Sequence, residues 1–133
     1  TWVNWNKLGM AKASVMNNET DIDLDLLCSY VHGNKIRIYD GMLSRYIGDV
    51  LLHVDNHHLS EAENWIKKAI EAYKSNGMMF ELGRTYALYE KLCAKNKDKL
   101  GAKANFARAI DIFKECGADG WVKKYEQEWA LLP

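Results

Sequence analysis

The sequence predicts an all-α fold, and three observations lead to that prediction. The only proline among the 133 residues is Pro133, and glycines such as Gly77 and Gly117 fall between segments of regular pattern. Apolar residues recur at steps of three and four, the spacing that places them on one face of a helix. One stretch, residues 35–39, alternates as a strand does, but no second stretch could pair with it. We therefore assign residues 33–40 to the beginning of the helix that continues from Asp40.

Three helices are predicted in the first half of the chain. The first covers residues 1–16, and the second covers residues 21–32 after an acidic, asparagine-rich turn at residues 17–20. The third covers residues 40–54, where apolar residues again follow the helical period. Its apolar positions are Met42, Leu43, Tyr46, Ile47, Val50 and Leu51.

The helix predicted at residues 59–75 has the clearest boundaries. Ser60 is suited to the N-cap, where a hydroxyl oxygen can accept a backbone N–H bond. Glu63 and Lys67 stand four residues apart and are expected to form an ion pair on the solvated face. Gly77 is expected to end the helix, since glycine is common just past a helix C-terminus.

Three further helices complete the expected order. They cover residues 78–95, residues 99–116 after the polar turn 95–98, and residues from Asp119 or Gly120 to Leu132. Gly117 should end the second of these as Gly77 ends its counterpart. In the last helix the apolar face carries Val122, Tyr125, Trp129 and Leu132, and the other face is charged.

Charge and hydropathy exclude several classes of partner. Lys and Arg number 18, as do Asp and Glu, so there is no basic excess of the kind that binds nucleic acid. The basic residues of the second half are interleaved with acids, which favours a solvated face over a phosphate track. Apolar runs such as residues 47–54 are far shorter than the ~20 residues of a membrane helix. We expect neither a nucleic-acid nor a membrane partner.

The cysteines and the first residue indicate the setting of the chain. Cys28, Cys93 and Cys116 form an odd set with wide spacing, which suits neither a disulfide framework nor a CxxC metal site. A reducing, cytoplasmic location is therefore expected. No leader sequence is visible, and a chain that begins with Thr1 is expected to be part of a larger protein.

The residues between 53 and 58 could suggest a metal site. His53 and His57 are four residues apart, which would suit a metal if one helix contained both. The helical pattern breaks at Asp55, however, so a solvated turn is the favoured interpretation. We expect no metal and no other cofactor.

Two other groups resemble chemical sites but lack essential parts. Cys28 and His32 are four residues apart and could imitate a nucleophile and its base, yet no orienting group accompanies them. Asp21, Asp23 and Asp25 lack the glycine and the final glutamate of a calcium loop, and we interpret them as acids at a helix start. The sequence therefore predicts no catalytic residue and no enzyme.

An internal repeat relates the second half of the chain to the preceding part. When residues 62–77 are shifted by 40, they match residues 102–117, and most matched positions are small or apolar. A period between 20 and 50 residues that is carried by helices indicates a stacked helical repeat. The matched pairs are Ala62 and Ala102, Ile66 and Phe106, Ala69 and Ala109, Ile70 and Ile110, Tyr73 and Phe113, Lys74 and Lys114, and Gly77 and Gly117.

The spacing of these residues resembles the second helix of a tetratricopeptide repeat, as in Ala62, Ile66 and Ala69. Fragments of a first helix are also similar: Trp5-x2-Leu8-Gly9, Leu82-Gly83-x2-Tyr86 and Ile47-Gly48. The chain departs from the tetratricopeptide pattern in two ways. Glycine replaces the usual proline after the second helix, and the helices are longer than those of the minimal 34-residue unit.

The resemblance implies a right-handed superhelix of antiparallel helix pairs, an α-solenoid of about three pairs and a capping helix. It implies a single domain, residues 1–133. Its parts would be a divergent first pair (1–34), a second pair (35–77), a third pair (78–117) and a cap (118–133).

The resemblance also implies a binding function. Stacked first helices would line a concave groove that takes a peptide or another domain of the parent chain, as in regulatory segments of large signalling proteins. The residues nominated for contact are Arg45, Asp49, Arg84, Leu88 and Lys91. The balanced charge predicts no simple clamp for an acidic tail.

A structural function is the alternative. Terminal repeats need polar outer faces, and the apolar Trp2, Val3 and Trp5 are unusual for a free end. Through such an end the chain could stack on a second copy and form a homodimer, or it could serve as a spacer.

Overall fold

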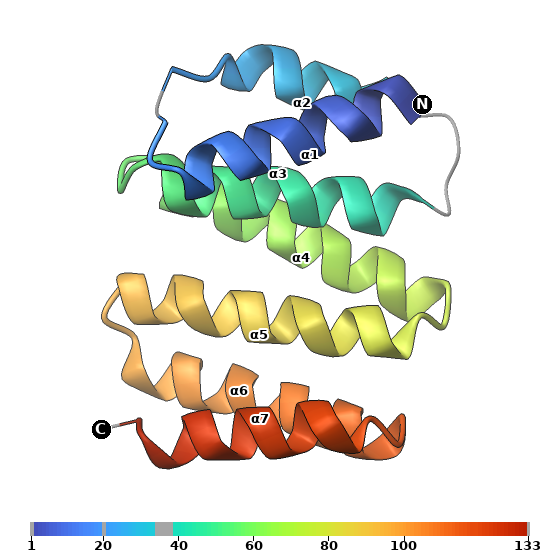
Figure 1. Ribbon diagram of the computed structural model, residues 1–133, viewed down its shortest axis with the longest axis vertical. Helices are drawn as coiled ribbons and strands as arrows, with labels where there is room; N and C mark the ends of the chain where they lie inside the picture. Colours follow the sequence, from blue (N-terminus) through green and yellow to red (C-terminus); the bar gives the residue numbers. More distant parts are fainter. Residues whose placement is uncertain (1, 20, 34–38, 133) are drawn as a thin grey trace. The chain divides into compact units, whose positions relative to one another are not determined.

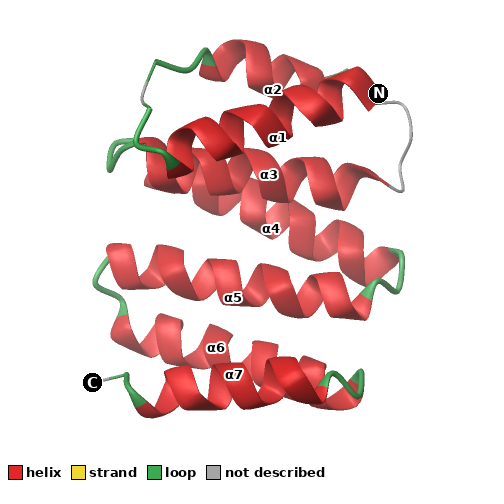
Figure 2. Cartoon of the chain, viewed as in Figure 1, coloured by secondary structure: helices red, strands yellow, loops and turns green. Residues whose placement is uncertain are grey.

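The computed structural model describes residues 2–19, 21–33 and 39–132, with side chains from residue 6 onward. Over these ranges the chain is all-α, with seven helices and no strand (Figures 1 and 2). The expected helical start at residues 33–40 falls largely on 34–38, which lie outside the described residues. The helices are α1 (Trp2–Met16), α2 (Leu24–His32), α3 (Asp40–Val54), α4 (Leu59–Ser75), α5 (Met79–Lys95), α6 (Lys99–Glu115) and α7 (Asp119–Ala130).

The chain divides into two compact units. The first comprises residues 1–72, and the second comprises residues 73–133, so the division falls within α4. Within each unit successive helices run in opposite directions (Figure 1). This all-α architecture confirms the fold class expected from the apolar periodicity.

The first unit has its core where α1, α2 and α4 meet α3. Helix α3 is the most buried of these helices, because neighbours pack on several of its sides. Its side chains Ile47, Val50 and Leu51 have no exposed surface. Opposite them the first unit buries Leu8 and Val15 of α1, Leu27 of α2, and Ala62, Ile66 and Ala69 of α4.

The second unit is built on the pairing of α5 with α6. Phe106, Ala109 and Phe113 of α6 are almost fully buried, as are Leu82 and Leu92 of α5. Helix α7 has no residue that is fully buried, and it attaches through aromatic side chains. Tyr125 stacks on Phe113 with 5.4 Å between the ring centroids.

The last four helices follow a strict 20-residue spacing. They begin at residues 59, 79, 99 and 119, and α4, α5 and α6 are each 17 residues long. Each helix and its turn therefore occupy 20 residues. Two such segments make 40 residues, the period at which the sequence repeats.

The helix ends explain why this spacing is so regular. After α1, α4, α5 and α6 one residue adopts the left-handed conformation, with φ between 61° and 68°. The next N–H then bonds to a carbonyl five residues back, as from Met78 N to Tyr73 O at 2.9 Å. The expected stops at Gly77 and Gly117 are confirmed. At the other two ends this position is filled by Asn18 and Lys97.

Two glycines mark close crossings between helices. A Cβ atom on Gly48 of α3 would lie 2.9 Å from Cγ1 of Ile66 in α4. A Cβ atom on Gly83 of α5 would lie 2.9 Å from Cε1 of Phe113 in α6. Gly9 of α1 differs, since its Cβ would meet nothing within 4 Å. The glycine that follows Leu or Ile in the repeat fragments thus permits close helix packing at Gly48 and Gly83 but is not needed for it at Gly9.

The structure confirms the predicted bounds of the helix over residues 59–75 but corrects its N-cap. Helix α4 begins at Leu59, and the N–H of Ala62 bonds to the carbonyl of His58 at 2.9 Å. His58 therefore stands at the N-cap, and Ser60 lies inside the first turn. The expected pair of Glu63 and Lys67 is present at 2.8 Å.

Candidate partner-binding surface

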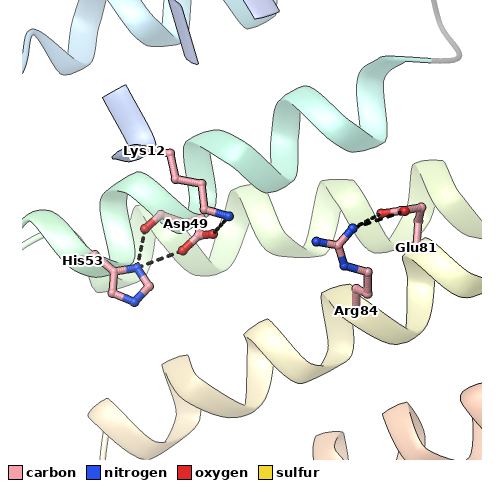
Figure 3. A network of polar contacts seen from close by, with 5 residues as sticks. All are labelled: Lys12, Asp49, His53, Glu81 and Arg84. Atoms are coloured by element: carbon pink, nitrogen blue, oxygen red, sulfur yellow. Dashed lines mark hydrogen bonds and ion pairs between the residues drawn. The ribbon is translucent and has the colours of Figure 1, made fainter. Parts of the chain in front are cut away.

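In the first unit, two of the nominated residues lie on one face of α3. Asp49 is 7% exposed, and one of its carboxylate oxygens is 2.8 Å from Nζ of Lys12 in α1. Its other oxygen is 2.8 Å from Nδ1 of His53, one turn further along α3 (Figure 3). Arg45 is 9% exposed. This face of α3 is therefore largely covered, and Asp49 is engaged by Lys12.

The partners of Asp49 determine its ionisation. Burial alone raises the pKa of Asp49, because it disfavours the charged form. The hydrogen bonds with His53 and Lys12, together with the charges of these groups, outweigh burial and hold the pKa below its usual value. Asp49 is thus kept ionised and acts as a link between α1 and α3.

In the second unit, Arg84 of α5 lies at an accessible position. Its side chain is 40% exposed and its Nη1 is 3.4 Å from a carboxylate oxygen of Glu81, one turn earlier (Figure 3). The Cζ atom of Arg84 is 5.9 Å from the ring centroid of Trp121 in α7, within the range of a cation–π contact. Helices α5 and α7 thus both contribute to this surface.

A second cation approaches the same indole. Nζ of Lys124 is 5.3 Å from the ring centroid of Trp121 and 5.5 Å from that of Tyr125. Lys124 is exposed, and Trp121 is partly exposed. We call Glu81, Arg84, Trp121 and Lys124 the cation–indole surface.

Packing beneath the cation–indole surface holds the indole in place. Trp121 meets Phe80 of α5 edge to face at 5.6 Å and lies 5.7 Å from Phe113 of α6. Tyr125 continues the aromatic layer at 5.9 Å from Trp121. Burial, with the nearby Glu128 adding to it, raises the pKa of Tyr125, so the phenol stays neutral. A ring fixed on three sides offers a preorganised contact surface.

The remaining nominated residues share the face of α5 that carries Arg84. Leu88 follows four residues later and is 8% exposed, whereas Lys91 follows after seven and is exposed. Of the five nominated residues, Arg84 and Lys91 therefore have surface that a partner could reach. Arg45, Asp49 and Leu88 are largely covered.

Sequence reasoning did not nominate Trp121 or Lys124, although a signal for Lys124 was present. The 40-residue shift that relates residues 62–77 to residues 102–117 also carries Arg84 onto Lys124. Trp121 carried no comparable signal, because aromatic residues in helices usually pack in the core, and part of its indole does pack, on Phe113.

The groups that resemble chemical sites have other partners in the structure. Helix α3 ends at Val54, so His57 and His58 lie in the turn before α4, and Nδ1 of His58 is 2.8 Å from Asp55. Within the described residues no group of three or more His, Cys, Asp or Glu side chains could hold a metal ion.

The environment of Cys28 disfavours a thiolate. Burial raises the pKa of Cys28, and Glu61 and Asp25 raise it further. The ring of His32 packs against Trp65, with 5.3 Å between the centroids. Helix α2 begins at Leu24 and not at residue 21 as predicted, so Asp21 precedes the helix. Asp23 caps α2 by accepting the N–H of Leu26 at 3.0 Å, and Asp25 lies in the first turn.

In the described part of the chain, no helix is both long and apolar enough to cross a membrane. In comparisons with known proteins, the chain matches no family model, no curated protein and no solved structure. The case for function therefore depends on the repeat and on the cation–indole surface.

Proposed function

We propose that this chain is a tetratricopeptide-like repeat domain that binds a peptide or another protein domain, and that it is not an enzyme. The observation that carries the proposal is the cation–indole surface. Arg84 and Lys124 occupy equivalent positions of the 40-residue repeat, and both lie against Trp121.

The regular helix spacing supports a repeat domain. In tetratricopeptide-like arrays the first helices of successive pairs line a concave groove, and by the 40-residue period α5 and α7 are equivalent first helices. The proposal includes the right-handed superhelix of about three pairs and a cap. The partner would lie along α5 and α7, where tryptophan and arginine are the residue types enriched at binding hot spots.

The composition of the surface also favours recognition of another protein. Arg84 and Lys124 are cations, Glu81 is an anion, and Trp121 is apolar with one N–H donor. Lys91 extends the surface by two helical turns from Arg84. Such a mixture suits a peptide with both apolar and charged side chains, as in a regulatory segment of a signalling protein.

The test is affinity capture of partners with matched variants. Arg84→Ala combined with Lys91→Ala removes two exposed cations with little effect on packing. The matched control is Lys123→Ala, which removes an exposed cation of α7 that is not part of the cation–indole surface. We expect the affinity of the double variant for each specific partner to be at least tenfold weaker, and the affinity of the control to be unchanged. Unchanged binding by the double variant would refute the proposed surface.

Self-association is a second candidate function, favoured by exposed apolar side chains. In the first unit Met10, Met16 and Leu26 are 70%, 57% and 47% exposed. The side chains of Trp2, Val3 and Trp5, nominated for such contacts, lie outside the described residues. Light scattering over a wide concentration range tests this function: a dimer that weakens in Met10→Glu supports it, and a monomer throughout excludes it.

A further inference from the structure

A pocket in the second unit is separate from the cation–indole surface. It has a volume of about 270 Å³ and lies where the end of α5 turns into α6, with Leu132 closing one side. Its apolar lining is formed by Ala94, Ala102 and Leu132. Because Ala94 is exposed, the pocket is open to solvent.

Three lysines surround this apolar lining. Lys97 occupies the turn after α5, while Lys99 and Lys103 lie one turn apart on α6 and so share a face. All three are exposed. Glu90 is the one carboxylate among the lining residues, so the rim carries three positive charges against one negative charge.

The one acid among the described lining residues is itself disfavoured in its charged form. Burial raises the pKa of Glu90; Glu128 raises it further, while Lys91 acts in the opposite direction. The nearby Asp98 is engaged as the N-cap of α6, where its carboxylate accepts the N–H of Gly101 at 2.9 Å. The rim is therefore positive, although the whole chain has no net charge.

The size of the pocket restricts the ligand. Pockets for drug-sized molecules typically occupy about 300–1,000 Å³, and this one falls just below that range. It suits a single large apolar side chain. The three lysines stand at separate positions of the turn and of α6, so several acids along a peptide could each pair with one of them, whereas a fatty acid offers a single carboxylate.

We propose that this pocket binds an acidic peptide segment, with one apolar side chain inserted between Ala94, Ala102 and Leu132 and with flanking carboxylates paired with Lys97, Lys99 and Lys103. The site is independent of the cation–indole surface, so the two proposals can fail separately. It also shows how a chain of balanced charge can hold a local site for acidic partners.

The proposal is tested with short blocked peptides and the whole chain. The probe is a fluorescein-labelled peptide in which one phenylalanine is flanked on each side by two glutamates. The comparison peptides replace phenylalanine with alanine or the glutamates with lysines. We expect the probe to bind at least tenfold more tightly than either comparison peptide, with an affinity that falls as salt concentration rises.

Variants locate the binding. Ala94→Phe fills the pocket from an exposed position, so it should abolish binding without unfolding the chain. Lys99→Glu combined with Lys103→Glu should weaken binding at least tenfold, whereas Lys123→Glu on α7 should not change it. Glu90→Gln should strengthen binding severalfold, because it removes the one competing carboxylate.

Three outcomes would overturn the proposal. They are absence of probe binding, binding that persists in Ala94→Phe, and displacement of the probe by octanoate as readily as by unlabelled peptide. The last would indicate a site for a fatty acid instead of a peptide. None of these outcomes concerns Arg84 or Trp121, so the proposed function would be unaffected.

Discussion

At the residue scale, the ionisation of Asp49 is connected with the stability of the first unit. Asp49 is nearly buried, and its carboxylate links Lys12 of α1 to His53 of α3. Its folded pKa is lowered, so its contribution to stability is present above the unfolded pKa near 4 and is lost as pH falls through the lower folded value.

We predict that Asp49→Asn lowers the free energy of unfolding by about 1–2 kcal/mol at pH 7. This loss is at the low end of the range for hydrogen bonds to charged groups, because Lys12 is partly exposed to solvent. Urea unfolding at pH 7 and near pH 3 measures the difference, which should shrink in acid. Glu71→Gln, an exposed change on α4, is the control. An equal loss at both pH values would contradict this role for Asp49.

The left-handed residue after four of the helices, α1, α4, α5 and α6, is the second feature at residue scale. Lys97 has φ of 61° and Gly117 has φ of 68°, at equivalent places one helix apart. A side chain other than glycine is strained in this conformation, at a cost of roughly 1 kcal/mol.

The two positions allow a reciprocal experiment. Lys97→Gly should raise the free energy of unfolding by about 0.5–1 kcal/mol, and Gly117→Lys should lower it by about 1 kcal/mol. A Cβ on Gly117 would meet nothing within 4 Å, so strain alone is changed there. Thermal unfolding of both variants provides the measurement. Changes of the same sign in both would show that the backbone conformation is not the cause.

At the scale of elements, the close crossing of α3 and α4 depends on Gly48. Alanine in place of glycine within a helix stabilises by up to about 1 kcal/mol. At Gly48 that gain competes with a Cβ placed 2.9 Å from the fully buried Ile66, and overpacking costs about 1–3 kcal/mol.

We therefore predict that Gly48→Ala destabilises the chain by about 1–2 kcal/mol, whereas Gly9→Ala stabilises it by about 0.5–1 kcal/mol. Both glycines lie within helices of the first unit, and Gly9 has open space where its Cβ would be. Chemical denaturation of the two variants measures both effects. If Gly48→Ala proved as stabilising as Gly9→Ala, the close crossing would have no energetic importance.

Much of the order of elements was predictable from local signals. Gly77 and Gly117 end their helices as expected, and the periodic apolar residues of α4 and α6 form the core. The predicted N-cap at Ser60 was wrong by two residues. The error arose because His58, which is not a preferred N-cap residue, occupies that position.

The candidate surface was less predictable, because it depends on which helices cover which faces. Arg45 and Asp49 have the spacing of a helix face, but no local pattern shows that Lys12 of α1 would pair with that face. Local pattern is equally uninformative for Trp121, whose indole packs on Phe113 and is also contacted by the cations of Arg84 and Lys124. The 40-residue repeat was the exception, since it relates Lys124 to Arg84.

At the scale of the whole molecule, the 20-residue spacing of the last four helices unites these features. The left-handed residues after α4, α5 and α6 recur at this spacing. Arg84 and Lys124 are separated by twice this spacing, which is the 40-residue repeat. The central claim is that such a repeat presents the cation–indole surface to a peptide partner.

Selection from a random peptide-display library tests that claim most directly. The selection is run on Ala94→Phe, which blocks the separate pocket, and on the same variant with Arg84→Glu and Lys91→Glu added. We predict that the first enriches a family of related peptides and that the second fails to enrich it. No enrichment by the first, or the same family from both, would contradict the account.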